Sequence, residues 1–202
     1  MRLRVIAVAV FLMARVPAGA VTEVLTDRDV AHAYAIANGS EATRTLFHAA
    51  YRVPTDEPTI EQFEVVTEFR RFVLAAEDAL KSGSWMMARG GFDAKGRSLK
   101  DHLRPLAGQV SIRARVRFHP LNNYTAPPPM DILLGEPTLL AINALRTPHV
   151  TTGESGTRDV INGATIETFF NAPTIADRVL PVRLIFEGRE LARARVDFAR
   201  VE

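Results

Sequence analysis

Arginines at alternate positions are the feature of this chain that comes closest to a functional pattern. In the segment 110–118, Arg113, Arg115 and Arg117 alternate with apolar residues, so a β-strand would place all three side chains on one face. Successive side chains on a strand face stand about 6.6–7 Å apart. The planar guanidinium group suits carboxylates and phosphates. This spacing predicts an arginine face that docks an anion, unless acidic residues beside it neutralise an ordinary solvated sheet face.

The residues that follow this strand complete the candidate ligand-binding set. His119 comes directly after the arginines, and Asn122, Asn123 and Tyr124 lie in the next loop. Histidine is the usual acid–base side chain near neutral pH. The group supports two hypotheses, which are a docking surface continuous with the arginines and, as the alternative, the loop-borne residues of a hydrolase.

Several other kinds of chemistry are excluded or find no support. The chain has no cysteine, which excludes disulfides, thiolate catalysis and zinc–thiolate sites. None of the five histidines shows metal-motif spacing, and no phosphate loop or dinucleotide fingerprint is present. Gly153 and Ser155 resemble part of an esterase elbow, but Thr157 stands where that motif needs its second glycine. We therefore predict no metal, no cofactor and no identifiable catalytic residue.

The first 20 residues have the three parts of a secretory signal peptide. Arg2 and Arg4 make a basic start, residues 5–13 are apolar, and Ala18-Gly19-Ala20 forms a small-residue cleavage site. The alternative is an uncleaved anchor, but a run of about nine apolar residues falls short of the about twenty that span a bilayer. We expect cleavage after Ala20 and a periplasmic or extracellular protein.

The predicted cleavage also changes how the charge is interpreted. The whole chain has a formal net charge of +2, and the segment 1–20 contributes three arginines and no acid, so residues 21–202 carry −1. A near-neutral protein gives no reason to expect nucleic-acid binding. Lys81, Lys95 and Lys100 are the only lysines, and such an excess of arginine is typical of a GC-rich bacterial genome. The expected partner is an unknown envelope protein or an anionic polymer or lipid.

The region 21–107 reads as helical. Thr26 and Ser40 have the positions of helix N-caps, and the residues leading to Pro54 fit either a second helix or a helix followed by a strand. Thr59-Ile60-Glu61-Gln62 matches a capping box, and the apolar stripe behind it predicts one helix up to about Lys81. Ser98 is expected to cap a short helix through Leu103.

The region 108–202 reads as strands, because apolar residues alternate there with a period of two. The expected strands are Val110–Phe118, Met130–Leu134, Leu139–Leu145, Thr165–Phe170 after an Asn162-Gly163 turn, and a hairpin over Val179–Val201. A flexible loop is expected at 151–158. The hairpin turns at Gly188, and its two apolar faces meet one core only if the loop has three residues or a β-bulge lies near Glu187–Arg189.

These patterns predict an α+β fold, with an N-terminal helical half packed on or beside a C-terminal antiparallel β-sandwich of six or seven strands. The expected regions are the signal peptide 1–20, the helical region 21–107 and the sandwich region 108–202. The strand half resembles immunoglobulin-like modules in texture only, because it lacks their cysteines. The functional expectation is an exported, non-enzymatic binding or assembly module of the bacterial cell envelope. A purely structural role and the hydrolase near His119 stay open.

Overall fold

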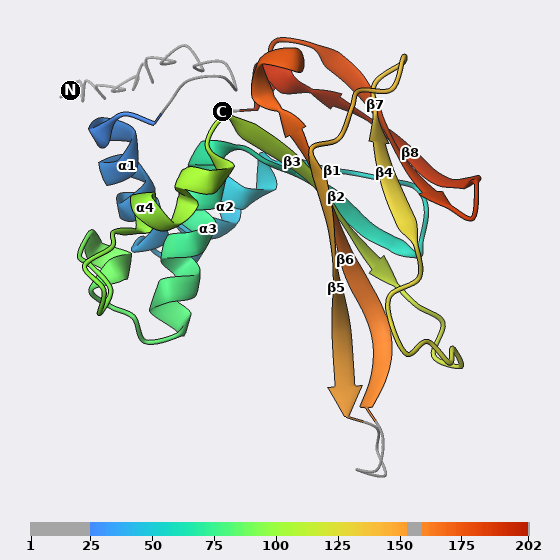
Figure 1. Ribbon diagram of the computed structural model, residues 1–202, viewed down its shortest axis with the longest axis horizontal. Coiled ribbons are helices and arrows are strands. Elements are labelled where there is room, and N and C mark those ends of the chain that lie inside the picture. The colour runs from blue at the N-terminus through green and yellow to red at the C-terminus, as the bar shows by residue number, and fades with distance from the viewer. Residues whose placement is uncertain (1–24, 153–158, 202) are drawn as a thin grey trace, which may run out of the picture.

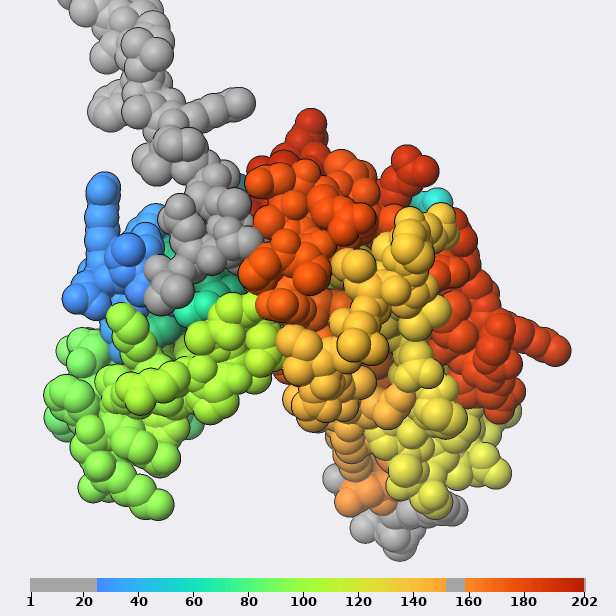
Figure 2. Space-filling model, turned by 45° about the horizontal axis from the view of Figure 1, so that its top comes forward, coloured from blue at the N-terminus to red at the C-terminus, as the bar shows by residue number. Residues whose placement is uncertain are grey.

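The computed structural model describes residues 25–152 and 159–201. The predicted signal peptide and most of the predicted loop at 151–158 lie outside the described residues, so both stay predictions. The described chain forms a helical part on one side and two antiparallel sheets on the other (Figure 1). The space-filling view shows the helical part, in blue to green, beside the C-terminal strands of the sheets, in yellow to red (Figure 2).

The helical part contains α1 (Asp27–Ala37), α2 (Glu41–Ala49), α3 (Glu68–Lys81) and α4 (Leu99–Leu103). Each helix begins after a hydroxyl residue whose side-chain oxygen accepts a backbone N–H, namely Thr26, Ser40, Thr67 and Ser98. Three of these four caps were predicted from the sequence and are confirmed. A small apolar core holds the helices together, formed by Ala33, Ala37, Phe72, Val73, Ala76 and Leu99. Short 3₁₀ turns occur at η1 (Met87–Arg89), η2 (Arg104–Leu106), η3 (Ala172–Thr174) and η4 (Phe198–Arg200).

Eight strands in the described residues make two sheets. The larger sheet has the order β1-β2-β3-β6-β5, and the smaller has the order β4-β7-β8. The strands are β1 (Arg52–Val53), β2 (Ile60–Val66), β3 (Gln109–Arg117), β4 (Met130–Leu134), β5 (Asn143–Thr152), β6 (Asp159–Asn171), β7 (Val179–Phe186) and β8 (Arg189–Asp197). All pairings between neighbours are antiparallel.

The two sheets share one apolar core. Buried residues of β3 and β6, such as Ile112 and Ile166, belong to the same cluster as Leu134, Val182 and Leu184 of the smaller sheet. Both inner faces follow the period-2 alternation that the sequence shows. The arrangement confirms the predicted α+β class with a sandwich-like pair of antiparallel sheets.

The predicted helix over 59–81 is wrong in its first part. Residues 60–66 form strand β2, and the helix α3 begins only at Glu68, capped by Thr67. Val65 pairs with Ile112 of β3 and is fully buried, as is Phe63. The apparent capping box at Thr59 is overridden because strand pairing and core burial outweigh a local propensity.

Two further expectations in the strand region are wrong. The segment Leu139–Leu145 is not a buried strand, because β5 begins at Asn143 and Leu140 is 92% exposed. β5 is an edge strand, and every residue from 141 to 148 is exposed. The pair Asn162-Gly163 is not a turn but lies inside β6, where Gly163 pairs with both Arg117 and His149.

The C-terminal hairpin is confirmed, together with its irregular register. Glu187 and Gly188 both have positive φ, of 49° and 75°, as a two-residue type I′ turn requires. A register shift after Leu184 restores the parity that lets both arms face one core. The hairpin lies in the smaller sheet, so Arg193 does not extend the arginine face; it pairs with Glu190 and Glu136 instead.

The described residues contain no helix that is both long and apolar enough to span a membrane.

Candidate functional site

Strand β3 places the three predicted arginines on the outer face of the larger sheet. Its inner positions, Val110, Ile112, Ala114 and Val116, are buried in the sandwich core. β3 lies between β2 and β6, so side chains of two neighbouring strands flank the arginines. The predicted alternation is confirmed, and it decides which acidic residues can reach each guanidinium group.

Arg113 is fully engaged by an acid on the next strand. It pairs across β3 and β6 with Glu167, and its Nη2 lies 3.0 Å from Glu167 Oε2. The other oxygen of that carboxylate accepts a hydrogen bond of 2.6 Å from Ser111 Oγ. Because the Glu167 side chain is only 13% exposed, this group is a structural ion pair rather than an open binding position.

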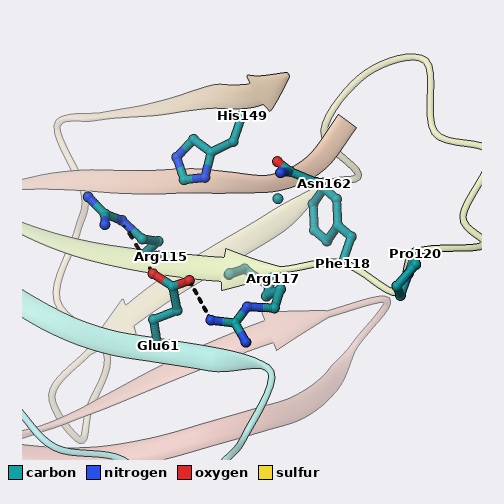
Figure 3. Close-up of a pocket in the computed structure, with 9 residues that line it drawn as sticks. Glu61, Arg115, Arg117, Phe118, Pro120, His149 and Asn162 are labelled. Carbon is teal, nitrogen blue, oxygen red and sulfur yellow. Dashed lines mark hydrogen bonds and ion pairs between the residues drawn. The ribbon is translucent and has the colours of Figure 1, made fainter. Parts of the chain in front are cut away.

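Arg115 and Arg117 share a single carboxylate, which belongs to Glu61 at the start of β2. Arg117 Nη2 lies 3.0 Å from Glu61 Oε1, and Arg115 Nε lies 3.7 Å from Glu61 Oε2 (Figure 3). The arginine side chains are 52% and 68% exposed. Two positive groups against one negative group leave an excess positive charge that is open to solvent.

These two arginines line an open basin with a volume of about 520 Å³. The structure adds His149 of β5, Asn162 of β6 and the ring of Phe118 to its wall, as Figure 3 shows. We name this set, with Glu61, Arg115, Arg117 and Pro120, the arginine basin. His149 Nε2 lies 2.8 Å from Thr165 Oγ1, which fixes the orientation of the imidazole ring.

Gly163 keeps one wall of the arginine basin open. A Cβ atom at this position would lie 2.5 Å from the carbonyl oxygen of Val116 and 3.2 Å from His149 Nδ1. Real Cβ atoms do not approach a backbone oxygen so closely, so only glycine fits between β3 and β5 here. The absence of a side chain lets the imidazole of His149 lie beside the arginine strand.

The loop residues of the candidate set have mostly structural partners. Asn122 donates through Nδ2 to the carbonyl oxygens of His119 and Ile161, which ties the loop to β6. Tyr124 packs against Phe118 with ring centroids 5.1 Å apart. His119 Nδ1 accepts the backbone N–H of Leu121 at 3.1 Å, and the ring is exposed. Asn123 is exposed.

Two buried arginines at the other end of the arginine face were missed by sequence reasoning. Arg70 and Arg71 of α3 are only 2% and 7% exposed. Arg70 Nη2 lies 3.1 Å from Glu64 Oε2. Burial lowers the pKa of Arg70 below its usual value, while the Glu64 carboxylate acts in the opposite direction.

Arg71 joins α3 to the larger sheet. Its guanidinium donates to the carbonyl oxygens of Leu106, Gln109 and Val66 and to Ser111 Oγ, at 3.1–3.4 Å. Burial lowers its pKa, and the Glu167 carboxylate opposes that shift. The helix and the arginine-bearing strand are therefore connected by a buried cation.

Other histidine–acid pairs occur away from the arginine basin. His48 Nε2 lies 2.9 Å from Glu77 Oε1 between α2 and α3, and His102 Nε2 lies 3.0 Å from Asp93 Oδ2. The backbone N–H of Arg97 and further hydrogen bonds hold the pKa of Asp93 well below its usual range. Within 25–152 and 159–201, no three His, Asp or Glu residues gather as a metal ion would need.

The comparisons with known proteins give no further guide to the chemistry of this site. No family model, no curated protein and no solved structure matches the chain.

Proposed function

We propose that this protein is an exported binding module of the bacterial cell envelope that docks an anionic group in the arginine basin. The observation that carries the proposal is the sharing of one carboxylate, Glu61, by two exposed guanidinium groups, Arg115 and Arg117. A carboxylate or phosphate that enters the basin can pair with the excess positive charge and accept hydrogen bonds from the guanidinium N–H groups that Glu61 leaves unused.

The shape of the arginine basin favours a group carried by a larger partner. Its volume of about 520 Å³ lies in the range of ligand sites. Both arginines are more than half exposed, so a small molecule would stay largely in solvent. If the acidic group belongs to an envelope polymer, lipid or protein, the rest of that partner would cover the solvent-exposed side of the arginine basin.

The export part of the proposal rests on the signal-peptide pattern of residues 1–20. The hydrolase hypothesis near His119 stays a prediction. The partner that the described structure gives the His119 ring is the backbone N–H of Leu121, so no observation favours an acid–base role there.

The proposal is tested by chromatography of the purified full chain on phosphocellulose and on carboxymethyl cellulose. The first resin presents phosphate and the second carboxylate, so the two columns distinguish the sources of the anionic group. Arg115→Ser with Arg117→Ser is compared with Arg193→Ser with Arg195→Ser, which removes the same charge from the smaller sheet.

We expect the variant of the arginine basin to elute at lower salt than the wild type, and the variant of the smaller sheet to elute with the wild type. Equal elution of the two variants on both resins would mean that retention reflects overall charge, and the proposed docking role would be abandoned.

A further inference from the structure

The helical part carries a second surface, unrelated to the arginine basin, at its end away from the sheets. Three large apolar side chains are exposed there within a few residues of one another: Trp85 at 58%, Met86 at 71% and Phe92 at 58%. We call these three residues the apolar tip. It lies in the green loops at the lower left of Figures 1 and 2.

The apolar tip is held in a defined conformation. Met87 and the buried Ala88 anchor the turn in the helical core, and Asn38 Nδ2 of the α1 C-terminus donates to the Ala88 carbonyl at 2.9 Å. The backbone N–H of Gly91 donates to the Met86 carbonyl at 2.7 Å. The turn is fixed at both ends and directs its apolar side chains outward. Such an exposed apolar surface indicates a site that a membrane or another molecule covers.

The segment that carries the apolar tip is rich in cations. The segment 81–107 contains six Lys and Arg residues and two Asp residues, a formal net charge of +4, and it holds all three lysines of the chain. Arg89 and Lys95 are exposed, and neither has an ion-pair partner in the described part of the chain. Lys95 lies in the turn that starts at Phe92, which is bridged to Ser98.

We propose that the apolar tip inserts into the interface of an anionic lipid bilayer, while Arg89 and Lys95 bind the headgroups. Tryptophan and phenylalanine occupy the headgroup boundary of membranes, and lysine and arginine near the surface gain affinity from anionic lipid. Stable membrane anchoring takes two contributions together, such as an apolar anchor and a basic patch. The loop supplies both at one place, and this charge complementarity favours a lipid surface.

The experiment uses Trp85 itself as the probe, because it is the only tryptophan in the chain. The full chain is mixed with vesicles of phosphatidylcholine alone, and with vesicles containing phosphatidylglycerol and phosphatidylcholine in equal parts. The fluorescence of Trp85 and its quenching by lipids with brominated acyl chains are recorded. We expect a blue shift and quenching with the anionic vesicles and a much weaker response with the neutral ones.

Two variants keep the probe and remove one contribution each. Met86→Ser with Phe92→Ser should abolish quenching. Arg89→Ser with Lys95→Ser should weaken binding about 30-fold, taking roughly a fivefold loss per cation. The matched control is Leu121→Ser with Leu140→Ser, which removes two even more exposed apolar side chains from the sandwich part and should change nothing.

Absence of quenching with anionic vesicles would overturn the proposal. Vesicle binding without quenching of Trp85 would place the contact elsewhere on the chain and would overturn it too. The same holds if Met86→Ser with Phe92→Ser behaves like the control. Because all the substituted side chains are exposed, unchanged circular dichroism of each variant confirms that a loss of binding is not a loss of folding.

Discussion

Replacing Arg71 by methionine tests whether the buried guanidinium fastens α3 to the sheet that carries the arginine basin. The substitution keeps most of the aliphatic volume and removes every donor. Three carbonyl oxygens, of Val66, Leu106 and Gln109, lose this partner. Each carbonyl left without a partner costs about 1–3 kcal/mol, and bonds of 3.1–3.4 Å belong at the low end of that range. We expect a loss of about 2–4 kcal/mol in the free energy of unfolding.

The assay is urea denaturation followed by circular dichroism, with a thermal scan as a second readout. For a chain of this size, about 1 kcal/mol corresponds to roughly 2–4 °C in Tm. The control is Arg115→Met, the same chemical change at a half-exposed position whose ion pair with Glu61 spans 3.7 Å. An exposed pair contributes about 0–1 kcal/mol, so this variant should unfold almost like the wild type.

A third variant separates charge from geometry. Arg71→Lys keeps the positive charge but lacks the planar fork that reaches several acceptors. The stability of this variant should therefore lie between those of Arg71→Met and Arg115→Met. The reasoning is refuted if Arg71→Met destabilises the protein no more than Arg115→Met does, because the buried hydrogen bonds would then contribute nothing that an exposed arginine does not.

Four further outcomes follow from the structure. Gly163→Ala should destabilise the protein by about 1–3 kcal/mol in urea denaturation, because its Cβ would lie 2.5 Å from a backbone oxygen. Glu61→Gln should raise the salt concentration at which the protein elutes from phosphocellulose, because both arginines of the basin lose their counter-charge. Asp93→Asn should lower Tm at neutral pH: the folded-state pKa of Asp93 is depressed, so its contribution is present above the usual pKa of 3.8 and is lost as pH falls. N-terminal sequencing of the protein recovered after export should begin at Val21.

Each of these outcomes has a clear opposite. A Gly163→Ala protein as stable as the wild type would mean that β3 and β6 separate without cost. Unchanged elution of Glu61→Gln would show that its carboxylate does not compete for the arginines. If Asp93→Asn and wild type lose stability in parallel from neutral to acid pH, the hydrogen bonds of Asp93 contribute nothing. An intact Met1 on exported protein would contradict the signal peptide.

Local patterns predicted the parts of the fold that depend on local physics. The N-caps at Thr26, Ser40 and Ser98 need only a hydroxyl three residues before a free backbone N–H. The alternation that places Arg113 on the outer face of β3 needs only the period of a strand, as does the parity that required a bulge in the hairpin. These predictions are correct because each feature depends only on residues that are close together in the sequence.

The remainder of the site depends on which strands become neighbours. Glu61 lies 56 residues from Arg117, and its capping pattern and apolar spacing predict a helix rather than the strand that it occupies. His149 joins the arginine basin only because β5 pairs with β6 and β6 with β3. Arg71 lies in a helical segment, and nothing local shows that carbonyl oxygens of two other segments surround its guanidinium group. Residues 141–148 are all exposed, so β5 shows no clear burial pattern of a buried strand.

The most direct measurement of the central claim is the response of individual arginine side chains to a small anion. ¹⁵N-labelled protein is titrated with tripolyphosphate, and the Nε–H resonances of the arginines are followed by NMR. We expect Arg115 and Arg117 to shift together and saturably, while Arg113, held by Glu167, and Arg193 of the smaller sheet do not shift. Equal shifts at all four arginines, or none at Arg115 and Arg117, would contradict an anion-docking site in the arginine basin.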